Sequence, residues 1–259
     1  MKCVILAGGL GTRISEESHL KPKPMIEVGG MPILWHIMKI YSYYGYNEFV
    51  ICAGYKQDVI KEWFANYFIH TSDVTFDFTN DNKMIIHNRH AEPWKVTVVD
   101  TGYNTQTGGR IKRIKPYVGD ETFMLTYGDA VGNINVGELV ELHKRSGKIG
   151  TISVYNFGQN KGVLELDASG GISAFREKSD FDGDLINIGF MVFQPEIFEY
   201  IDDDNTVFEK EPMVRLVEEK QLDAYVHRGY WQCMDTLREK NQLEKLWNDK
   251  CAPWKIWKD

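Results

Sequence analysis

The N-terminal part of the chain alternates short apolar runs with segments of helical periodicity, and this rhythm limits the possible folds most strongly. The run Lys2–Ala7 ends in glycines and is typical of a buried parallel strand. Pro32 stands at a favoured first position of a helix, and apolar residues then recur at helical spacing as far as Tyr44. A second apolar run, Glu48–Ala53, stops at Gly54. This repetition predicts a doubly wound, mostly parallel α/β sheet.

Later segments continue the pattern less regularly. A second helix is predicted around 59–67, and further helices at Val136–Ser146, Phe208–Glu219 and Thr236–Asn248. Strands are predicted at Val74–Phe78, Lys95–Asp100, Phe123–Tyr127, Ile149–Tyr155 and Ile186–Phe193, and a hairpin at Gly162–Phe175. We find no repeat or linker, so residues 1–259 are predicted to form one domain with two halves that meet near residue 150.

Composition excludes several classes of protein. With 43% hydrophobic residues, the 259-residue chain can bury a large core, and its net charge of −7 disfavours a nucleic-acid partner. The four cysteines form no CxxC pair, and Cys3 and Cys52 lie in apolar runs, so we expect neither a zinc site nor disulfides. No apolar stretch reaches membrane-spanning length, and we expect no leader before the first strand. We therefore expect a cytoplasmic protein that does not insert into a membrane.

The first strand runs directly into a glycine-rich loop. Glycines allow the backbone to approach a phosphate and to present N–H groups to it, and an arginine can clamp a phosphate through its planar fork. The spacing matches neither GxGxxG nor GxxxxGK[ST]. The alternative is a tight turn that binds nothing. The candidate ligand-binding residues are Leu6, Ala7, Gly8, Gly9, Leu10, Gly11, Thr12 and Arg13.

A basic, proline-stiffened segment follows the glycine loop. In Lys21-Pro22-Lys23-Pro24-Met25 the prolines fix the directions of the two lysine side chains. Two cations held close to a glycine loop suit a polyphosphate. The alternative is a solvated basic turn.

Two aspartates stand at positions where a ligand could bind. Asp129 follows the predicted strand Phe123–Tyr127, at a carboxyl end where α/β folds place ligands, and Asp235 precedes the last helix. Two carboxylates from distant segments suit one Mg²⁺ ion. The alternatives are a turn residue for Asp129 and a helix cap for Asp235.

The motifs together resemble a known family. LAGGLGTR followed by KPKPM is similar to the signature of the sugar-nucleotide pyrophosphorylases. The longer run LAGGLGTRISEESHLKPKPMIEVGGMPILWHIMKIY resembles the glucose-1-phosphate cytidylyltransferases (CDP-glucose pyrophosphorylases). So do VIKEWFANYF, DVTF, VTVVDTG, TGGRIKRIK, TYGDAV, GYWQCMDTLREK and APWKIW. These stretches extend from the first strand almost to the last residue.

The resemblance implies a reaction and an architecture. CTP and α-D-glucose 1-phosphate would give CDP-glucose and pyrophosphate, with Mg²⁺ as cofactor. The implied fold is Rossmann-like, with a doubly wound mixed sheet of the nucleotide-diphospho-sugar transferase type. Residues from about 1 to 150 would bind the nucleotide, and residues from about 151 to 259 would form a smaller part for sugar binding and oligomerisation. A homohexamer is implied, as is a role in the synthesis of dideoxy sugars for bacterial surface polysaccharides, such as the O-antigen of lipopolysaccharide.

The resemblance also implies roles for individual residues. Arg13 and Lys23 would act in catalysis on the phosphates, Asp129 and Asp235 would hold the metal, and Asp129 would also contact the nucleotide. Thr105 and Arg110 would contact CTP, the alternative being a loop with a solvated arginine. The residues implied for the sugar are Glu177, Lys178, Asn187, Gly189, Tyr230 and Trp231, and core packing is the alternative for the last two.

Two positions depart from the family pattern. Ser179 stands where a proline is common, and Ile188 stands where a glycine is usual, so bulk at Ile188 could shift the loop or narrow the pocket. Two alternative functions stay open. One is a nucleotidylyltransferase that uses another base, such as that of UTP or dTTP, or another sugar. The other is a non-catalytic nucleotide-sugar sensor. His36 and His143 lie in predicted helices and are interpreted as packing residues rather than metal ligands.

Overall fold

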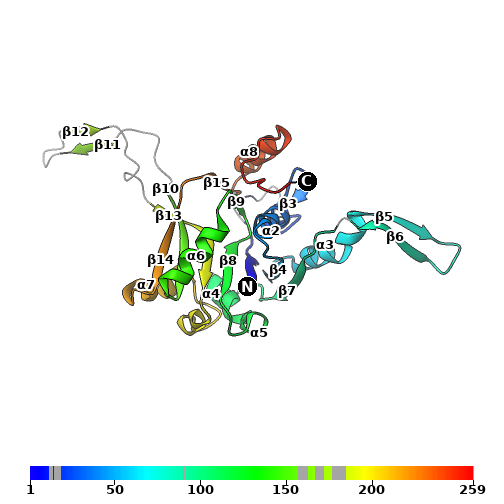
Figure 1. Cartoon of the computed structure of the whole chain (residues 1–259), viewed down its shortest axis with the longest axis horizontal. Coiled ribbons are helices and arrows are strands. Elements are labelled where there is room, and N and C mark those ends of the chain that lie inside the picture. The colour runs from blue at the N-terminus through cyan, green and yellow to red at the C-terminus, as the bar shows by residue number, and fades with distance from the viewer. Residues whose placement is uncertain are drawn as a thin grey trace.

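A seven-stranded mixed sheet forms the centre of the protein (Figure 1). The computed structural model describes residues 1–11, 14, 19–89, 91–156, 163–166, 172–176 and 185–258. Strand order is β14-β10-β13-β8-β1-β4-β7. The strands are β1 (Cys3–Ala7), β4 (Glu48–Ala53), β7 (Lys95–Asp100), β8 (Phe123–Tyr127), β10 (Gly150–Asn156), β13 (Leu185–Phe193) and β14 (Leu222–His227). Only β13 runs antiparallel to its neighbours, which confirms the predicted mixed, mostly parallel sheet.

Both faces of the sheet are covered, as a doubly wound fold requires. Along β1, Cys3, Ile5 and Ala7 join one hydrophobic cluster, and Val4 and Leu6 join the other. The first face is covered by α2 (Ile33–Tyr43), α3 (Gln57–His70), α6 (Val136–Ser146) and α8 (Leu237–Asn248). The second is covered by α4 (Thr107–Arg113), α5 (Lys115–Val118), α7 (Glu211–Glu218) and the 3-10 helix η3 (Pro195–Tyr200).

Short elements complete the fold. The 3-10 helix η2 (Lys23–Met25) precedes the ribbon of β2 (Glu27–Val28) and β3 (Met31–Pro32), and β9 (Ala130–Gly132) pairs with β15 (Trp231–Cys233). Two hairpins project away from the sheet (Figure 1): β5 (Ser72–Asp77) with β6 (Lys83–Arg89), and β11 (Val163–Leu166) with β12 (Ile172–Arg176). The β11–β12 pair confirms the predicted hairpin strands; its turn lies outside the described residues.

The C-terminal tail docks on the body. Trp254 is 1% exposed, and its indole Nε1 donates a hydrogen bond to His36 Nδ1 (3.4 Å). His36 Nε2 is 2.8 Å from the carbonyl oxygen of Val28 and donates to it, so both ring nitrogens are occupied in the neutral form. His36 and His143 are both fully buried, which confirms that they are packing residues.

The structure differs from the predicted elements in a few places. Helix α7 begins at Glu211 instead of Phe208, because Phe208 is buried in the preceding loop and Pro212 occupies the first helical turn. Helices α4 and α5 and the edge strand β14 were not predicted. Cys3 and Cys52 are buried, and all four cysteines are free, as expected. Within the described part of the chain, no helix has the length and apolar character needed to cross a bilayer.

Candidate active site

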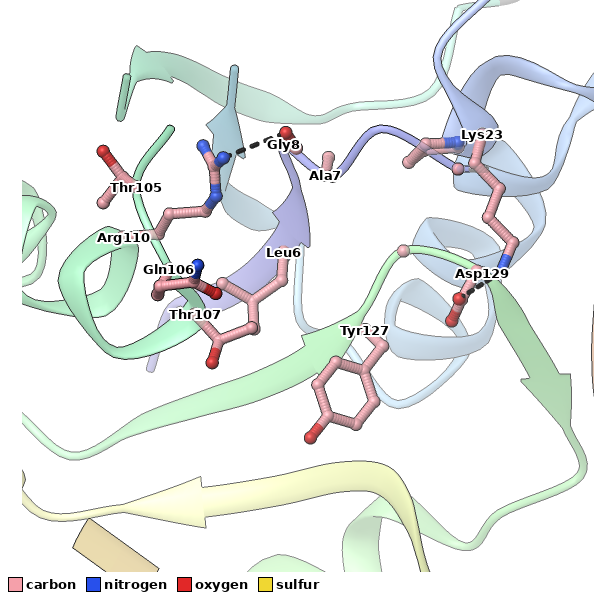
Figure 2. A pocket seen from close by; sticks show the side chains of 14 residues that line it. Leu6, Ala7, Gly8, Lys23, Thr105, Gln106, Thr107, Arg110, Tyr127 and Asp129 are labelled. Atoms are coloured by element: carbon pink, nitrogen blue, oxygen red, sulfur yellow. Dashed lines mark hydrogen bonds and ion pairs between the residues drawn. The ribbon is translucent and has the colours of Figure 1, made fainter. Parts of the chain in front are cut away.

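A cavity of about 360 Å³ opens at the carboxyl ends of β1 and β8 (Figure 2). Parallel strands of α/β sheets place ligands at this edge. In Figure 2 the N-terminal part of α4 lies on one side, Lys23 and Asp129 lie on the other, and the glycine loop lies between them. The lining residues that the structure describes are Leu6, Ala7, Gly8, Gly9, Gly11, Lys23, Pro24, Thr105, Gln106, Thr107, Arg110, Tyr127, Gly128 and Asp129.

The glycine loop forms one wall of the cavity. Five of its eight predicted ligand-binding residues line the cavity, and Leu10 is exposed at the surface. Thr12 and Arg13 lie outside the described residues. A Cβ atom on Gly8 would come within 2.1 Å of Arg110 Nη1, whereas a Cβ on Gly9 would meet nothing within 4 Å. Glycine at position 8 is therefore required by the close approach of Arg110.

Arg110 is buried behind this loop. It is only 5% exposed, so the alternative of a solvated loop arginine is wrong. Its guanidinium donates to the carbonyl oxygens of Gly8 (3.0 Å) and Gly102 (2.7 Å) and to Thr101 Oγ1 (2.8 Å). Burial lowers the pKa of Arg110 from its usual value. The side chain thus ties the glycine loop to the segment that follows β7, and a direct contact with CTP stays a prediction.

Thr105 lines the cavity beside two residues that were not among the predicted contacts. It is 9% exposed, and Gln106 and Thr107 follow it at the start of α4. Tyr127, at the end of β8, is a further lining residue that was missed. Pro24 and Gly128 also line the cavity and were missed. All five missed residues adjoin selected ones, so their positions next to Lys23, Thr105 and Asp129 were the available signal.

Lys23 lies between the two predicted metal ligands. Its Nζ donates to Asp129 Oδ2 (2.6 Å) and also to Asp235 Oδ1. Burial disfavours the charged ammonium, but attraction to Asp129 and hydrogen bonds to both carboxylates outweigh this, so the pKa of Lys23 is raised. Lys21, the other lysine expected close to the glycine loop, is not among the described residues that line the cavity and forms an ion pair with Glu27.

Backbone pairing brings the two aspartates together. The amide of Met234 donates to the carbonyl oxygen of Asp129 (2.8 Å), in register with the β9–β15 pair. Asp235 is not the helix cap: Thr236 occupies that position, and Glu239 accepts hydrogen bonds from the amides of Asp235 and Thr236 (both 2.8 Å). The carboxylate of Asp235 is therefore not needed for capping and turns toward Lys23.

The chemistry of these groups fits Mg²⁺. Two hard carboxylate oxygens converge on one point that already holds a cationic group, the Lys23 ammonium. In the described residues no cluster of three or more His, Cys, Asp or Glu side chains could hold a metal. Phosphate oxygens or water would have to complete the coordination of an ion held by Asp129 and Asp235.

The predicted sugar residues are only partly described. Asn187 Oδ1 accepts a hydrogen bond from the amide of Gly189 (2.9 Å), and Gly189 has a φ of +84°. A Cβ at Gly189 would lie 2.3 Å from Tyr127 Cδ2, so glycine allows the Tyr127 ring to pack there. Ile188 is 1% exposed within the core, so its bulk does not narrow the cavity. Glu177, Lys178 and Ser179 lie outside the described residues.

Tyr230 and Trp231 pack outside the cavity lining that the structure describes. The Tyr230 ring stacks on Trp254 with centroids 5.9 Å apart, and Trp231 lies 6.1 Å from Tyr155. The Trp231 indole donates to the carbonyl oxygen of Ile188 (3.1 Å). These contacts favour core packing for Tyr230 and indicate that Trp231 stabilises the backbone at Ile188. Contacts of either residue with the sugar stay predictions.

Comparisons with known proteins agree with the geometry. The family model described as "Nucleotidyl transferase" matches residues 2–249. The chain is 51% identical to the glucose-1-phosphate cytidylyltransferase of Salmonella typhi over 258 residues, covering 99% of this chain and 100% of the relative. It is 43% identical to the probable glucose-1-phosphate cytidylyltransferase of Bacillus subtilis, with the same coverage.

Solved structures show the same fold at low sequence identity. Apo-UDP-glucose pyrophosphorylase superposes with a TM-score of 0.69 at 15% identity, covering 96% of this chain and 98% of that one. A putative glucose-1-phosphate thymidylyltransferase from Bacillus anthracis gives a TM-score of 0.67 at 16% identity, covering 100% and 98%. The chain therefore belongs to the nucleotidyl transferase family of enzymes, in the group of the glucose-1-phosphate cytidylyltransferases.

Proposed function

We propose that the protein transfers the cytidylyl group of CTP to α-D-glucose 1-phosphate, giving CDP-glucose and pyrophosphate. The observation that carries this proposal is the convergence of Lys23, Asp129 and Asp235 beside the glycine loop. Three charged side chains from distant segments meet at one end of the cavity, beside the glycine loop. Such a site suits the joining of two phosphorylated substrates, and the cytidylyltransferase relatives support the choice of cytosine and glucose.

The chemistry requires positioning and positive charge more than a strong base. A phosphate oxygen of the sugar substrate attacks the α-phosphorus of CTP, and the bond from this phosphorus to the oxygen bridging the β-phosphate breaks. Pyrophosphate leaves with that bond's electron pair. In this proposal the glycine-loop amides and Arg13 hold the β- and γ-phosphates, and Lys23 stabilises charge on the leaving group.

Asp129 and Asp235 would hold one Mg²⁺ ion, which when bound supplies positive charge to the phosphates of both substrates. Lys23 would pair with the phosphates in place of the two carboxylates. Thr105 and Arg110 keep the nucleotide side of the cavity in place, and Glu177, Lys178, Asn187 and Gly189 hold the glucose. The described lining of the cavity comes from the nucleotide half, from about 1 to 150, and the sugar half, from about 151 to 259, would supply the contacts to glucose.

We further propose a cytoplasmic homo-oligomer, a hexamer by resemblance, that supplies CDP-glucose for surface polysaccharides such as O-antigen. The projecting β5–β6 hairpin supports self-association, because it exposes large apolar side chains that water solvates poorly. These are Phe76, Phe78, Met84 and Ile85, which are 40% to 79% exposed.

The decisive experiment measures pyrophosphate release with glucose 1-phosphate and each nucleoside triphosphate in turn. CTP with Mg²⁺ is expected to be the preferred substrate, and removal of the metal with EDTA should abolish turnover until Mg²⁺ is restored. Asp235→Asn should lose activity, whereas Asp202→Asn, an exposed aspartate outside the cavity lining, should not. Turnover with UTP or dTTP but not CTP would overturn the base assignment. A protein that binds CDP-glucose yet turns over no triphosphate would be a sensor.

A further inference from the structure

A segment of the C-terminal half crosses the start of α4, the helix whose first residues line the nucleotide cavity. The amide of Gln106 donates to the carbonyl oxygen of Asp204, and the amide of Gly108 donates to that of Thr206 (both 2.9 Å). Amides at a helix start lack acceptors within the helix, so this segment supplies them from outside. The fit leaves no space for a side chain at Gly108, where a Cβ would lie 2.7 Å from the Thr206 carbonyl oxygen.

Glu209 ends this segment and bridges two cavity-lining residues. Its Oε2 accepts a hydrogen bond from Thr107 Oγ1 (2.6 Å), and its Oε1 accepts one from the Tyr127 hydroxyl (2.8 Å). Thr107 Oγ1 in turn accepts from the amide of Phe208 (2.9 Å), which orients the threonine hydroxyl toward the carboxylate. One carboxylate therefore joins α4 to the end of β8.

Tyr127 is constrained from its other side as well. Its ring fills the space left by the missing side chain of Gly189, next to Asn187 on β13. In the hydrogen bond between them, the phenol hydroxyl of Tyr127 is the donor and the Glu209 carboxylate is the acceptor. The Tyr127 ring thus connects Glu209 to β13, the strand that carries the predicted sugar-binding residues Asn187 and Gly189.

We propose that Glu209 is a positioning residue that sets the width of the substrate cavity by tying the α4 wall to the wall formed by Tyr127. This inference rests on the proposed function, because it assigns the α4 wall to the nucleotide and the β13 side to the sugar. Glu209 is not among the described residues that line the cavity, and it has no part in the chemical step. With the tie in place, the walls are ordered before the substrates arrive, and binding does not have to order them.

Loss of the tie should therefore weaken the binding of both substrates more than it slows chemistry. Glu209→Ala removes two hydrogen bonds to a charged acceptor. We expect the Kd for CTP, measured by calorimetry with Mg²⁺ and no sugar phosphate, to rise about tenfold. Both KM values should rise similarly, with kcat changing by less than about threefold, as for the loss of uniform binding. Glu218→Ala is the matched control, because Glu218 is an exposed glutamate of the adjacent α7.

A double-mutant cycle separates this role from general stabilisation. Tyr127→Phe should weaken CTP binding in the wild-type background and have little further effect in Glu209→Ala. If Glu209→Ala unfolds, Glu209→Gln replaces it in the cycle, because the amide keeps the shape but has only one accepting oxygen. Full additivity, or equal Kd values for Glu209→Ala and Glu218→Ala, would overturn the inference. If another triphosphate proves to be the substrate, the same cycle run with that nucleotide still tests Glu209, while the proposed cytosine specificity fails independently.

Discussion

The ion pairs of Lys23 predict that the protein without nucleotide resists metal binding. The ammonium lies at the point on which the carboxylates of Asp129 and Asp235 converge, so a divalent cation must displace it before binding there. Nucleotide phosphates would offer the ammonium new partners, and metal and nucleotide should therefore bind cooperatively. Replacing Lys23 with methionine keeps an unbranched side chain that is one heavy atom shorter, but leaves the two carboxylates uncompensated.

The expected change in metal affinity on removal of the Lys23 ammonium follows from the burial of the three charged side chains. The side chains are 10% exposed for Lys23, 28% for Asp129 and 19% for Asp235, so solvent screens the pairs only in part. A hydrogen bond to a charged group contributes about 1.5 to 3 kcal/mol. Taking the lower value for each of the two bonds gives about 3 kcal/mol, which corresponds to roughly 100-fold in a dissociation constant.

The assay is a titration of chelator-treated, nucleotide-free protein with Mn²⁺, followed by electron paramagnetic resonance. Lys23→Met should bind Mn²⁺ about 100-fold more tightly than the wild type. Lys21→Met removes the same charge from the same segment but leaves the aspartates paired, so it should behave like the wild type. Adding Asp129→Asn to Lys23→Met should remove the gain in Mn²⁺ affinity. Equal Mn²⁺ affinities for the two lysine variants would refute the reasoning.

Two further predictions concern stability. Gly8→Ala should lower the thermal midpoint, because its Cβ would come within 2.1 Å of the hydrogen-bonded Arg110; Gly9→Ala, with no atom within 4 Å, should leave it nearly unchanged. Burial lowers the pKa of His36 to about 4 from about 6.5, so the unfolded chain binds the extra proton first as the pH falls. The free energy of unfolding should therefore be fully retained above pH 6.5 and decline toward pH 4, by up to about 3 kcal/mol from this residue. Urea titrations should show a shallower decline for His36→Gln, and an identical decline would contradict the assignment.

The buried strands were predictable because both of their faces contact the core. In β1 and β4 nearly every residue is apolar, and a glycine ends each run, so the sequence marks the strand and its carboxyl end together. The edge strand β14 was not predicted, because LDAYVH mixes polar and apolar residues without a clear boundary. Helix α4 contains two adjacent glycines, which are poor helix formers, and its start is stabilised by backbone acceptors that lie far away in the chain.

The roles of charged residues were harder to separate. Lys21 and Lys23 have the same charge and each precedes a proline, yet only Lys23 faces the cavity, because tertiary packing decides the direction of η2. Arg110 is buried because Gly8 and Gly54 leave space for its guanidinium. That space is formed by two loops far apart in the sequence, and local spacing cannot reveal it.

For Asp235, the sequence itself contains a signal that decides whether this residue caps the last helix. The residues from Thr236 to Glu239 read Thr-Leu-Arg-Glu, the pattern of a capping box, in which the threonine is the cap and the glutamate bonds back to the helix start. The structure has this arrangement, with Glu239 holding the amides of both Asp235 and Thr236. A residue that precedes a complete capping box is not needed as the cap. The pattern alone therefore argues against the capping alternative for Asp235 and leaves its carboxylate available for the charged centre that it forms with Lys23 and Asp129.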